Sequence, residues 1–382
     1  MRRVSASTEH PAPDAYAPGH EIETLGEFDR VAATGSLAGC RLQSLDLTDR
    51  TFALLSVRTT GTVFLGCRME PDAAAKVGAD GALVFPPIPH LPFDPYRASL
   101  YDAGELYAGL VSEGYPATPD ARAYRWYQET RKNGDVFASM LRSVHDDAVS
   151  DALDERLVGE RVVGLMGGHA LERDSAAFAD AARLGRHLSR AGFTVATGGG
   201  PGAMEAANLG AYAAPFDDTM LDEALARLAK TPVFGPSLTD WAQAGFDVLD
   251  AWPDGGSSVG IPTWFYGHEP PNVFATAIAK YFVNAVREDG LLARSTAGVV
   301  FLPGAAGTVQ EIFDSATPNY YATASPTVPL VLVDRTHWTE RFPAWPLLQA
   351  LADGRPMSSR ITLVDSVTEV PEALERLSRT SD

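Results

Sequence analysis

The chain has 382 residues, of which 45% are hydrophobic and 21% are charged, a composition typical of a globular protein with a sizeable core. Its formal net charge of −18 argues against binding to nucleic acid or to an anionic membrane, because phosphate-rich partners require basic patches. An anionic small ligand would therefore need a local cluster of backbone N–H groups and a few cations.

The first part of the chain contains short elements separated by Gly and Asp turns. Residues 1–18 are rich in proline and poor in large apolar groups, which predicts a disordered tail. Residues 19–115 are expected to form a small α/β domain, and residues 116–158 a helical connector. Within these regions we expect a helix near residues 25–33, β-like runs at residues 52–57, 62–67 and 82–85, and helical sequence at residues 119–157.

From residue 159 to residue 382 the pattern alternates between strand and helix. The sequence shows no internal repeat anywhere along the chain. The predicted strands are residues 161–166, 193–196, 298–302, 329–333 and 361–364. The predicted helices are residues 175–190, 203–212, 273–286, 309–316 and 370–378. This alternation predicts a doubly wound (Rossmann-like), mostly parallel α/β sheet with ligands at the carboxyl ends of its strands.

Cys40 and Cys67 are the only cysteines, too few for a disulfide framework or a zinc site, and this usage fits a reducing compartment. The first residues lack the apolar stretch of a signal peptide. No run approaches the roughly 20 apolar residues of a membrane span. We therefore expect a cytoplasmic protein.

Two glycine-rich turns each follow a short apolar run and open a predicted helix. The first contains, in order, Gly198, Gly199, Gly200, Met204 and Glu205. The second contains Pro303, Gly304, Ala305, Ala306, Gly307, Thr308 and Glu311. Backbone N–H groups in such turns can approach an anion, and the helix N-terminus adds partial positive charge. Two such turns at one sheet edge predict a single phosphate-bearing ligand held from both sides.

The first turn also fits G-x-G-x-x-A, a form of the dinucleotide-binding fingerprint. It follows the second strand of its unit rather than the first, however, and no acidic residue stands at the end of a clear following strand to hold a ribose. The turn after the first strand, which contains Gly168, lacks the fingerprint. The sequence therefore disfavours NAD binding.

Glu311 has two interpretations. It forms a T-x-x-E capping box with Thr308, in which Thr308 is the N-cap and Glu311 serves only to stabilise its own helix. Alternatively, the small residues of the turn leave room for a ligand on which Glu311 acts. Glu205 is open to the same two interpretations, because a carboxylate in the first turn of a helix complements the helix dipole.

The predicted helix at residues 273–286 immediately precedes the strand that carries the second glycine turn. One of its faces is apolar and consists of Phe274, Ile278, Tyr281 and Ala285. Another face carries Thr276, Lys280, Asn284 and Arg287. This polar stripe is either a solvated face or part of the same cleft. In the second case Lys280 or Arg287 would supply a cation for the ligand.

Aromatic residues are dense at residues 262–270, near a sheet edge, and again at residues 319–321. Such a cluster is either part of the core or a platform for a ligand ring. A purine or pyrimidine would suit such a platform through stacking.

Residues 198–208 (GGGPGAMEAAN) and 303–311 (PGAAGTVQE) together resemble the LONELY GUY (LOG) family of nucleoside 5′-monophosphate phosphoribohydrolases. The family pattern is P-G-G-x-G-T-x-x-E, so Ala305 replaces its second glycine. The plant-type M-H-x-R-K segment is absent, and Arg287 is the best counterpart of its arginine. The resemblance covers about residues 160–335, and the extra N-terminal domain is similar to that of longer bacterial nucleotide nucleosidases.

The resemblance implies hydrolysis of an N-glycosidic bond to free base and ribose 5-phosphate, with no metal and no organic cofactor. It implies catalytic roles for Glu311, Arg287 and Glu205. Glu311 would stabilise the oxocarbenium-like transition state, Arg287 would anchor the phosphate or assist departure of the base, and Glu205 would help to hold the ribose. Substrate or phosphate binding is implied for Gly168, Gly198, Gly199, Gly200, Met204, Lys280, Asn284, Pro303, Gly304, Ala305, Ala306, Gly307 and Thr308.

The expected partner is a nucleoside monophosphate, with no nucleic acid and no membrane, and the resemblance also implies a homodimer or higher homo-oligomer. A decarboxylase, the older label of the family, would need a Schiff-base lysine, and Lys280 is the only lysine near the inferred site. The alternative function is a nucleotide sensor that uses the same pocket without hydrolysis.

Overall fold

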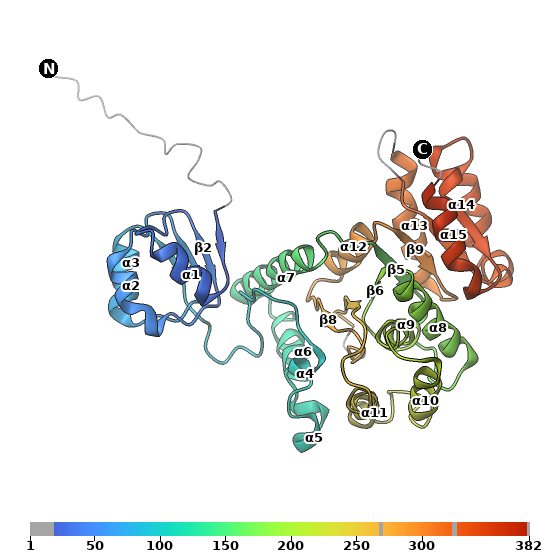
Figure 1. Ribbon diagram of the computed structural model, residues 1–382, viewed down its shortest axis with the longest axis horizontal. Helices are drawn as coiled ribbons and strands as arrows, with labels where there is room; N and C mark the ends of the chain where they lie inside the picture. The colour runs from blue at the N-terminus through green and yellow to red at the C-terminus, as the bar shows by residue number, and fades with distance from the viewer. Residues whose placement is uncertain (1–18, 267–269, 323–326, 380–382) are drawn as a thin grey trace. The chain divides into compact units, whose positions relative to one another are not determined.

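The computed structural model describes residues 19–266, 270–322 and 327–379, so the predicted tail at residues 1–18 lies outside the described residues. The chain divides into two compact units, Met1–Ala98 (unit 1) and Ser99–Asp382 (unit 2). The sequence analysis placed the end of the N-terminal domain later, at residue 115. Each unit is described by itself below (Figure 1).

Unit 1 is a small solenoid in which strands and helices alternate along the chain. Its four strands pair in parallel and in chain order. The residues matched in register, Glu21, Arg41, Val63 and Leu83, are 20, 22 and 20 residues apart. The expectation of no internal repeat is therefore wrong. The elements are β1 (Glu21–Ile22), α1 (Leu25–Ala32), β2 (Arg41–Gln43), α2 (Thr51–Ser56), β3 (Val63–Leu65), α3 (Pro71–Ala79) and β4 (Leu83–Phe85).

A glycine recurs two residues before the last three strands of unit 1. Gly39, Gly61 and Gly81 have φ of 76°, 70° and 89°, a left-handed conformation that glycine adopts without the clash of a Cβ atom. The Gly39 N–H donates to Thr60 O at 3.3 Å and the Gly61 N–H to Gly81 O at 3.1 Å. Successive repeats of the solenoid are therefore joined by hydrogen bonds in the loops before the strands as well as by those within the sheet.

The core of unit 1 lies between the sheet and its helices. Ile22, Leu42 and Phe64, one from each of three strands, are buried against helix side chains that include Leu54. Residues 52–57 were predicted as a strand and instead form α2, in which Leu54 is buried while Phe52 is 86% exposed. The β-propensity of this run is overridden by the topology, because successive parallel strands are joined by a crossover connection that is usually a helix.

Unit 2 is built on a seven-stranded parallel sheet in the order β11-β10-β9-β5-β6-β7-β8. The strands are β5 (Val162–Met166), β6 (Thr194–Thr197), β7 (Val259–Gly260), β8 (Ala277–Ile278), β9 (Gly298–Phe301), β10 (Leu330–Val333) and β11 (Ile361–Val364). Most are fully buried apolar runs, as expected for a parallel sheet covered on both faces. The predicted Rossmann-like, doubly wound fold is confirmed.

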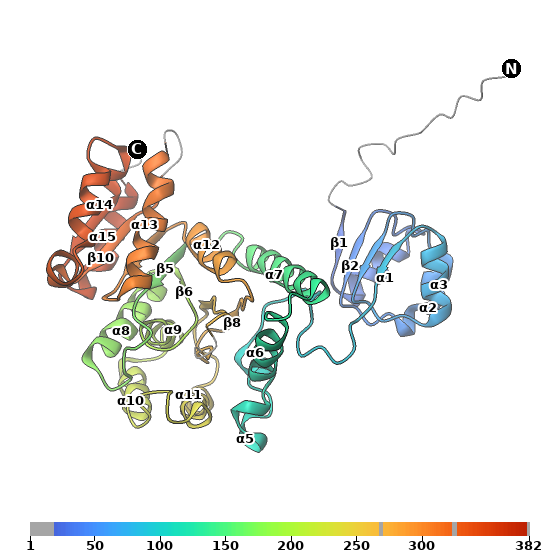
Figure 2. The ribbon, with the colours of Figure 1, turned by 180° about the vertical axis from the view of Figure 1, so that it is seen from behind.

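The helices of unit 2 begin with the predicted helical segment that precedes the sheet. They are α4 (Ala103–Leu106), α5 (Leu110–Glu113), α6 (Pro119–Thr130), α7 (Val136–Arg156), α8 (Ala176–Arg190), α9 (Ala203–Tyr212), α10 (Asp218–Leu228), α11 (Leu238–Ala251), α12 (Asn284–Arg294), α13 (Ala306–Tyr321), α14 (Ala344–Ala352) and α15 (Val370–Arg379). Helix α8 packs with α9 and α15, and α13 packs with α12 and α14. Figure 2 shows α8 beside α9 and α13 beside α14.

The strand order reverses direction between β5 and β9. From β5 the chain proceeds through β6 and β7 to β8, and from β9 it proceeds through β10 to β11 on the other side. In such sheets ligands bind outside the carboxyl ends of the strands at the point of reversal. The loops that follow β5 and β9 therefore define where a site is expected.

The predicted helix at residues 273–286 is wrong. This segment contains the short strand β8, which pairs with β7, and α12 begins only at Asn284. Phe274, Ile278 and Tyr281 are buried as predicted, but so are Ala275, Lys280 and Phe282, whereas Ala285 is exposed. Burial therefore does not follow one helical face, and a short buried strand can share the apolar spacing on which the helix was predicted.

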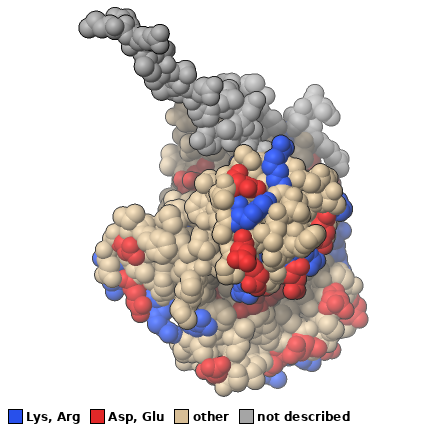
Figure 3. Space-filling view, turned by 90° about the vertical axis from the view of Figure 1, so that its left-hand side faces the viewer, with Lys and Arg blue, Asp and Glu red and all other residues tan. Residues whose placement is uncertain are grey.

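Within the described residues, no helix is long and apolar enough to cross a membrane. On the face drawn in Figure 3, Lys and Arg side chains are interspersed with Asp and Glu side chains.

Candidate functional site

A cavity of about 440 Å³ lies at the point of reversal, where the loops after β5 and β9 meet. The two loops are in contact, because the Gly168 N–H approaches Pro303 O at 3.4 Å. Eight residues proposed from the sequence line this cavity. They are Gly168, Met204, Arg287, Ala305, Ala306, Gly307, Thr308 and Glu311.

Arg287, on the first turn of α12, is the cation of the cavity. Its side chain is 8% exposed and is held by backbone oxygens: Nε donates to Ile261 O at 2.8 Å and Nη2 to Gly198 O at 3.4 Å. Its Nη1 lies 3.8 Å from Glu311 Oε1. The guanidinium is thus fixed in place with one edge directed to a carboxylate that also lines the cavity.

Gly198 makes room for that guanidinium. A Cβ atom at position 198 would lie 2.0 Å from Arg287 Nη2 and 2.6 Å from Met204 Sδ. Any larger residue would therefore displace Arg287 from its position beside Glu311. The first glycine of this turn shapes the site through Arg287, and Gly198 itself is not among the residues that line the cavity.

Helix α13 begins one turn earlier than the capping box predicted. Its N-cap is Ala305, so Thr308 is the third helical residue and Glu311 the sixth. The proposed capping box is therefore wrong, and Glu311 does not serve as the N3 residue of its helix. The N–H groups of Ala306, Gly307 and Thr308 lie instead at the helix end where intrahelical acceptors are lacking.

The backbone of this loop does not require glycine at position 305. The φ of Ala305 is −116°, outside the left-handed region that favours glycine. Gly304 is different, since a Cβ atom there would lie 2.1 Å from Thr308 Oγ1. The loop therefore requires glycine at position 304 and tolerates alanine at 305.

The first glycine turn is held by a buried amide network. The Gly199 N–H donates to Thr197 Oγ1 at 2.9 Å, and Asn272 donates to Gly199 O and Gly200 O at 2.8 and 3.1 Å. Asn208 Oδ1 accepts from both Thr197 and Asn272. The N–H and C=O groups of Gly199 and the C=O group of Gly200 are thus hydrogen-bonded within the protein, and neither residue lines the cavity.

Glu205 lies outside this cavity, in a buried ion pair with Arg173. The shortest contact, from Arg173 Nη2 to Glu205 Oε1, is 2.5 Å, and both side chains are 1% exposed. Burial raises the pKa of the Glu205 carboxyl, and Arg173 opposes that shift. Both residues line a separate cavity of about 320 Å³ with Trp241, over whose ring Arg173 lies. Arg173 was not identified from the sequence.

Lys280 and Asn284 do not line the cavity either. Lys280 is buried and its Nζ lies 2.5 Å from Asp120 Oδ1, far along the chain in α6. Asn284 donates to Glu288 Oε1 at 2.7 Å and to the Tyr266 hydroxyl at 3.1 Å. Asn284 therefore supports two lining residues from behind, while Lys280 belongs to the core.

Five lining residues were not proposed from the sequence: Gly167, His169, Ala170, Tyr266 and Glu288. Tyr266 belongs to the aromatic segment, whose members differ in burial. Trp264 is 2% exposed and stacks on Phe282 in the core, whereas Tyr266 is 44% exposed and faces the cavity. Part of this segment, residues 267–269, lies outside the described residues.

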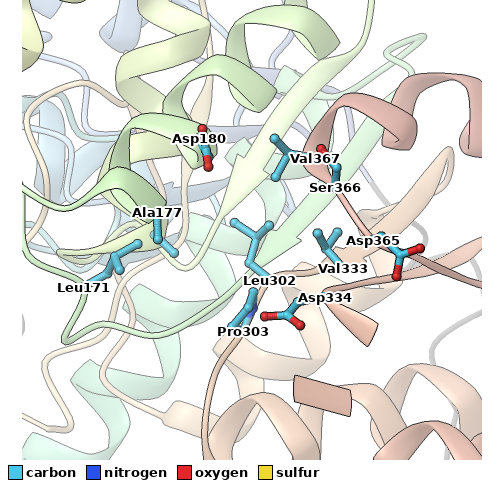
Figure 4. Close-up of a pocket in the computed structure, with 11 residues that line it drawn as sticks. Leu171, Ala177, Asp180, Leu302, Pro303, Val333, Asp334, Asp365, Ser366 and Val367 are labelled. Atoms are coloured by element: carbon cyan, nitrogen blue, oxygen red, sulfur yellow. The ribbon is translucent and has the colours of Figure 1, made fainter. Parts of the chain in front are cut away.

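Pro303 lines a neighbouring cavity of about 260 Å³. Figure 4 shows Leu302, which follows β9, Val333, the last residue of β10, and Val367, in the short helix after β11, gathered around it. Asp180, Asp334 and Asp365 add carboxylates to its lining. The loop after β9 thus has one cavity beside its Leu302 and Pro303 end and another beside residues 305–308.

No family model and no curated protein matches the chain. Solved structures similar to it include a molybdenum cofactor binding protein from Rippkaea orientalis (16% identity, 57% of this chain and 98% of that chain, TM-score 0.36). The molybdenum cofactor carrier protein of Chlamydomonas reinhardtii is 17% identical over 58% of this chain and 99% of that chain, with a TM-score of 0.35. A structural-genomics target, TM1055, is 21% identical over 56% and 99%, with a TM-score of 0.36.

Proposed function

We propose that the chain hydrolyses the N-glycosidic bond of a nucleoside 5′-monophosphate, as the resemblance of its two motifs to the LOG family implies. The observation that carries this proposal is the juxtaposition of Arg287 and Glu311, 3.8 Å apart, in a cavity that also contains the N-terminus of α13. A cation, a carboxylate and an anion-binding helix end are the three groups that this substrate requires.

The phosphate binds at the start of α13. The N–H groups of Ala306, Gly307 and Thr308 face it with the positive end of the helix dipole behind them. The Thr308 hydroxyl adds a donor, and Arg287 adds a positive charge at the cavity of a chain whose net charge is −18. Because Arg287 is fixed by Ile261 O and Gly198 O, it contributes a preorganised charge.

In the reaction, the bond between ribose C1′ and the base nitrogen breaks, and a bond between C1′ and a water oxygen forms. One proton of that water leaves with the base and the other remains on the new hydroxyl. The carboxylate of Glu311 stabilises the positive charge that develops on the ribose and orients the attacking water. The base stacks on Tyr266, whose ring is exposed at the cavity.

The test is an assay of the purified full-length chain with AMP, GMP, CMP, UMP and IMP, in which ribose 5-phosphate is measured. We expect turnover of at least one monophosphate and none of the matching free nucleoside, because phosphate binding is needed to orient the bond. Calorimetric binding of a monophosphate without product would favour the sensor. Equal turnover of adenosine and AMP would contradict the role of the α13 loop.

A further inference from the structure

His337 contacts the anion loop from outside the cavity. It lies in η4 (His337–Arg341), a π-helical turn that follows β10, and its N–H donates to Asp334 Oδ1 at 3.0 Å. Its imidazole is 8% exposed and is packed edge-on against Trp338, with ring centroids 4.6 Å apart, and against Phe342 at 5.4 Å. The ring is therefore held in one orientation by its own turn of chain.

The Nε2 atom of this ring meets both polar groups of Gly304. It lies 2.8 Å from Gly304 O and 3.2 Å from Gly304 N. One ring nitrogen either donates or accepts, so it makes only one of these two bonds. With the proton on Nε2, the ring donates to Gly304 O, the shorter of the two contacts. The carbonyl of Gly304 is thereby directed toward His337.

The direction of that carbonyl determines the direction of the next N–H. In a trans peptide the C=O of one residue and the N–H of the following residue point to opposite sides. Because Gly304 O is directed to His337, the N–H of Ala305 is directed away from it. Ala305 lines the 440 Å³ cavity, and His337 is not among the residues that line it.

We propose that His337 is a positioning residue that aims the Ala305 N–H at the anion bound in this cavity. The identity of the anion as a nucleotide phosphate rests on the proposed function, but the orientation of the peptide does not. A Cβ atom at position 304 would lie 2.1 Å from Thr308 Oγ1, so glycine is required beside the peptide whose carbonyl the imidazole contacts at 2.8 Å.

Two amide variants separate positioning from packing. Glutamine places a side-chain NH₂ close to where Nε2 lies, whereas asparagine is one methylene shorter and its NH₂ matches Nδ1 instead. Both are uncharged and polar, so a residue that merely fills space would respond to both in a similar way. Under the proposal His337→Gln keeps the hydrogen bond to Gly304 O, and His337→Asn loses it.

The experiment measures binding of ribose 5-phosphate and of inorganic phosphate by calorimetry, together with KM and kcat for the best monophosphate. We expect His337→Asn to weaken anion binding and raise KM about tenfold, the usual effect of one lost hydrogen bond to a charged group, with kcat changed less than about threefold. His337→Gln should bind within about threefold of the unaltered protein. His187→Leu, on an exposed position of α8, is the control and should bind normally.

Similar binding by the Asn and Gln variants, whether both normal or both weak, would overturn the proposal. The calorimetric measurement does not depend on turnover. A protein that binds phosphate with the expected difference between the two variants but hydrolyses no monophosphate would therefore retain the role of His337 and reject the proposed function. Hydrolysis with unchanged KM in the Asn variant would retain the proposed function and reject the role of His337.

Discussion

At position 198 the absence of a side chain provides the space that the Arg287 guanidinium occupies. The atoms that a new Cβ would meet, Arg287 Nη2 and Met204 Sδ, are ends of flexible side chains, so Gly198→Ala should move them without unfolding the sheet. We expect turnover to fall about 100-fold through displacement of Arg287 from Glu311, since a shift of about 1 Å in a site has effects of this size. Thermal unfolding should shift by only a few degrees. Unchanged kcat/KM would contradict the role given to Arg287.

Glu311→Gln removes one charge from the cavity and little else. Because Ala305 is the N-cap of α13, Glu311 does not cap the helix, and the variant should keep its melting temperature. Turnover should fall on the order of 100-fold or more if its charge stabilises the transition state. Asp314→Asn, on the exposed side of the same helix, provides the control. Near-native turnover of the Gln variant would exclude Glu311 as the stabilising carboxylate.

Eight of the residues proposed from the sequence line the cavity, and several other proposed residues do not. Glycine motifs after apolar runs are local signals, and they placed Ala305, Thr308 and Glu311 correctly in the cavity. The prediction that Lys280 binds the ligand was wrong, because its partner, Asp120, is 160 residues away and no local pattern connects them. His337 and Arg173 gave no local signal, since each acts through a contact that only the folded sheet creates.

At the scale of elements, the Arg173–Glu205 pair ties α9 to the loop after β5. Arg173 also donates to Trp241 O in α11, at 3.1 Å. Glu205→Gln leaves a buried guanidinium without its counter-charge, and we expect the free energy of unfolding to fall by about 3–5 kcal/mol. In the double variant Arg173→Met, Glu205→Leu, apolar replacement of the pair should restore much of this loss. Denaturant unfolding of the two variants measures both effects.

This experiment also tests the catalytic role inferred for Glu205. If that role were correct, the double variant would be stable but inactive. We expect instead a double variant whose turnover follows its folded fraction, because Glu205 lies in a separate cavity from Arg287 and Glu311.

Five of the seven strands in unit 2 follow from the sequence, as do the helices that connect the first of them, whereas β7, β8, α10, α11 and α14 were not predicted. Alternating buried strands and amphipathic helices give β5, α8, β6 and α9 within one or two residues. The segment around β8 was predicted as a helix because its large apolar residues recur at helical spacing, a pattern that a short buried strand with its flanking chain also produces. The repeat in unit 1 was missed because its regular features are single glycines and strands of two or three residues.

At the scale of the whole molecule, the two units contain different reporter groups for unfolding. Both cysteines lie in unit 1 and all six tryptophans lie in unit 2. Burial raises the pKa of both thiols, that of Cys67 to about 11, so at pH 8 each is a protonated and shielded group. Because the thiolate is the reactive form, labelling should be slow until unit 1 unfolds.

We therefore expect two denaturant midpoints, one for thiol labelling and one for tryptophan fluorescence. Unit 1 has a core of its own, and proteins with separate cores often depart from a single cooperative transition. Coincident midpoints would show that the units unfold together. Rapid labelling in the absence of denaturant would contradict the burial of Cys40 and Cys67. A Cys40→Ser variant assigns the labelling signal to one thiol.

The stacking of unit 1 has a consequence for how its length can change during evolution. Each strand pairs with the strand that directly follows or precedes it in the chain, so one turn of 20 or 22 residues is a removable module. Duplication of the segment between Gly39 and Gly61 would add one strand and one helix and leave the pairing on either side in register. Homologues are therefore expected to differ in this region by whole modules, while the spacing of the two glycine-rich turns in unit 2 stays constant.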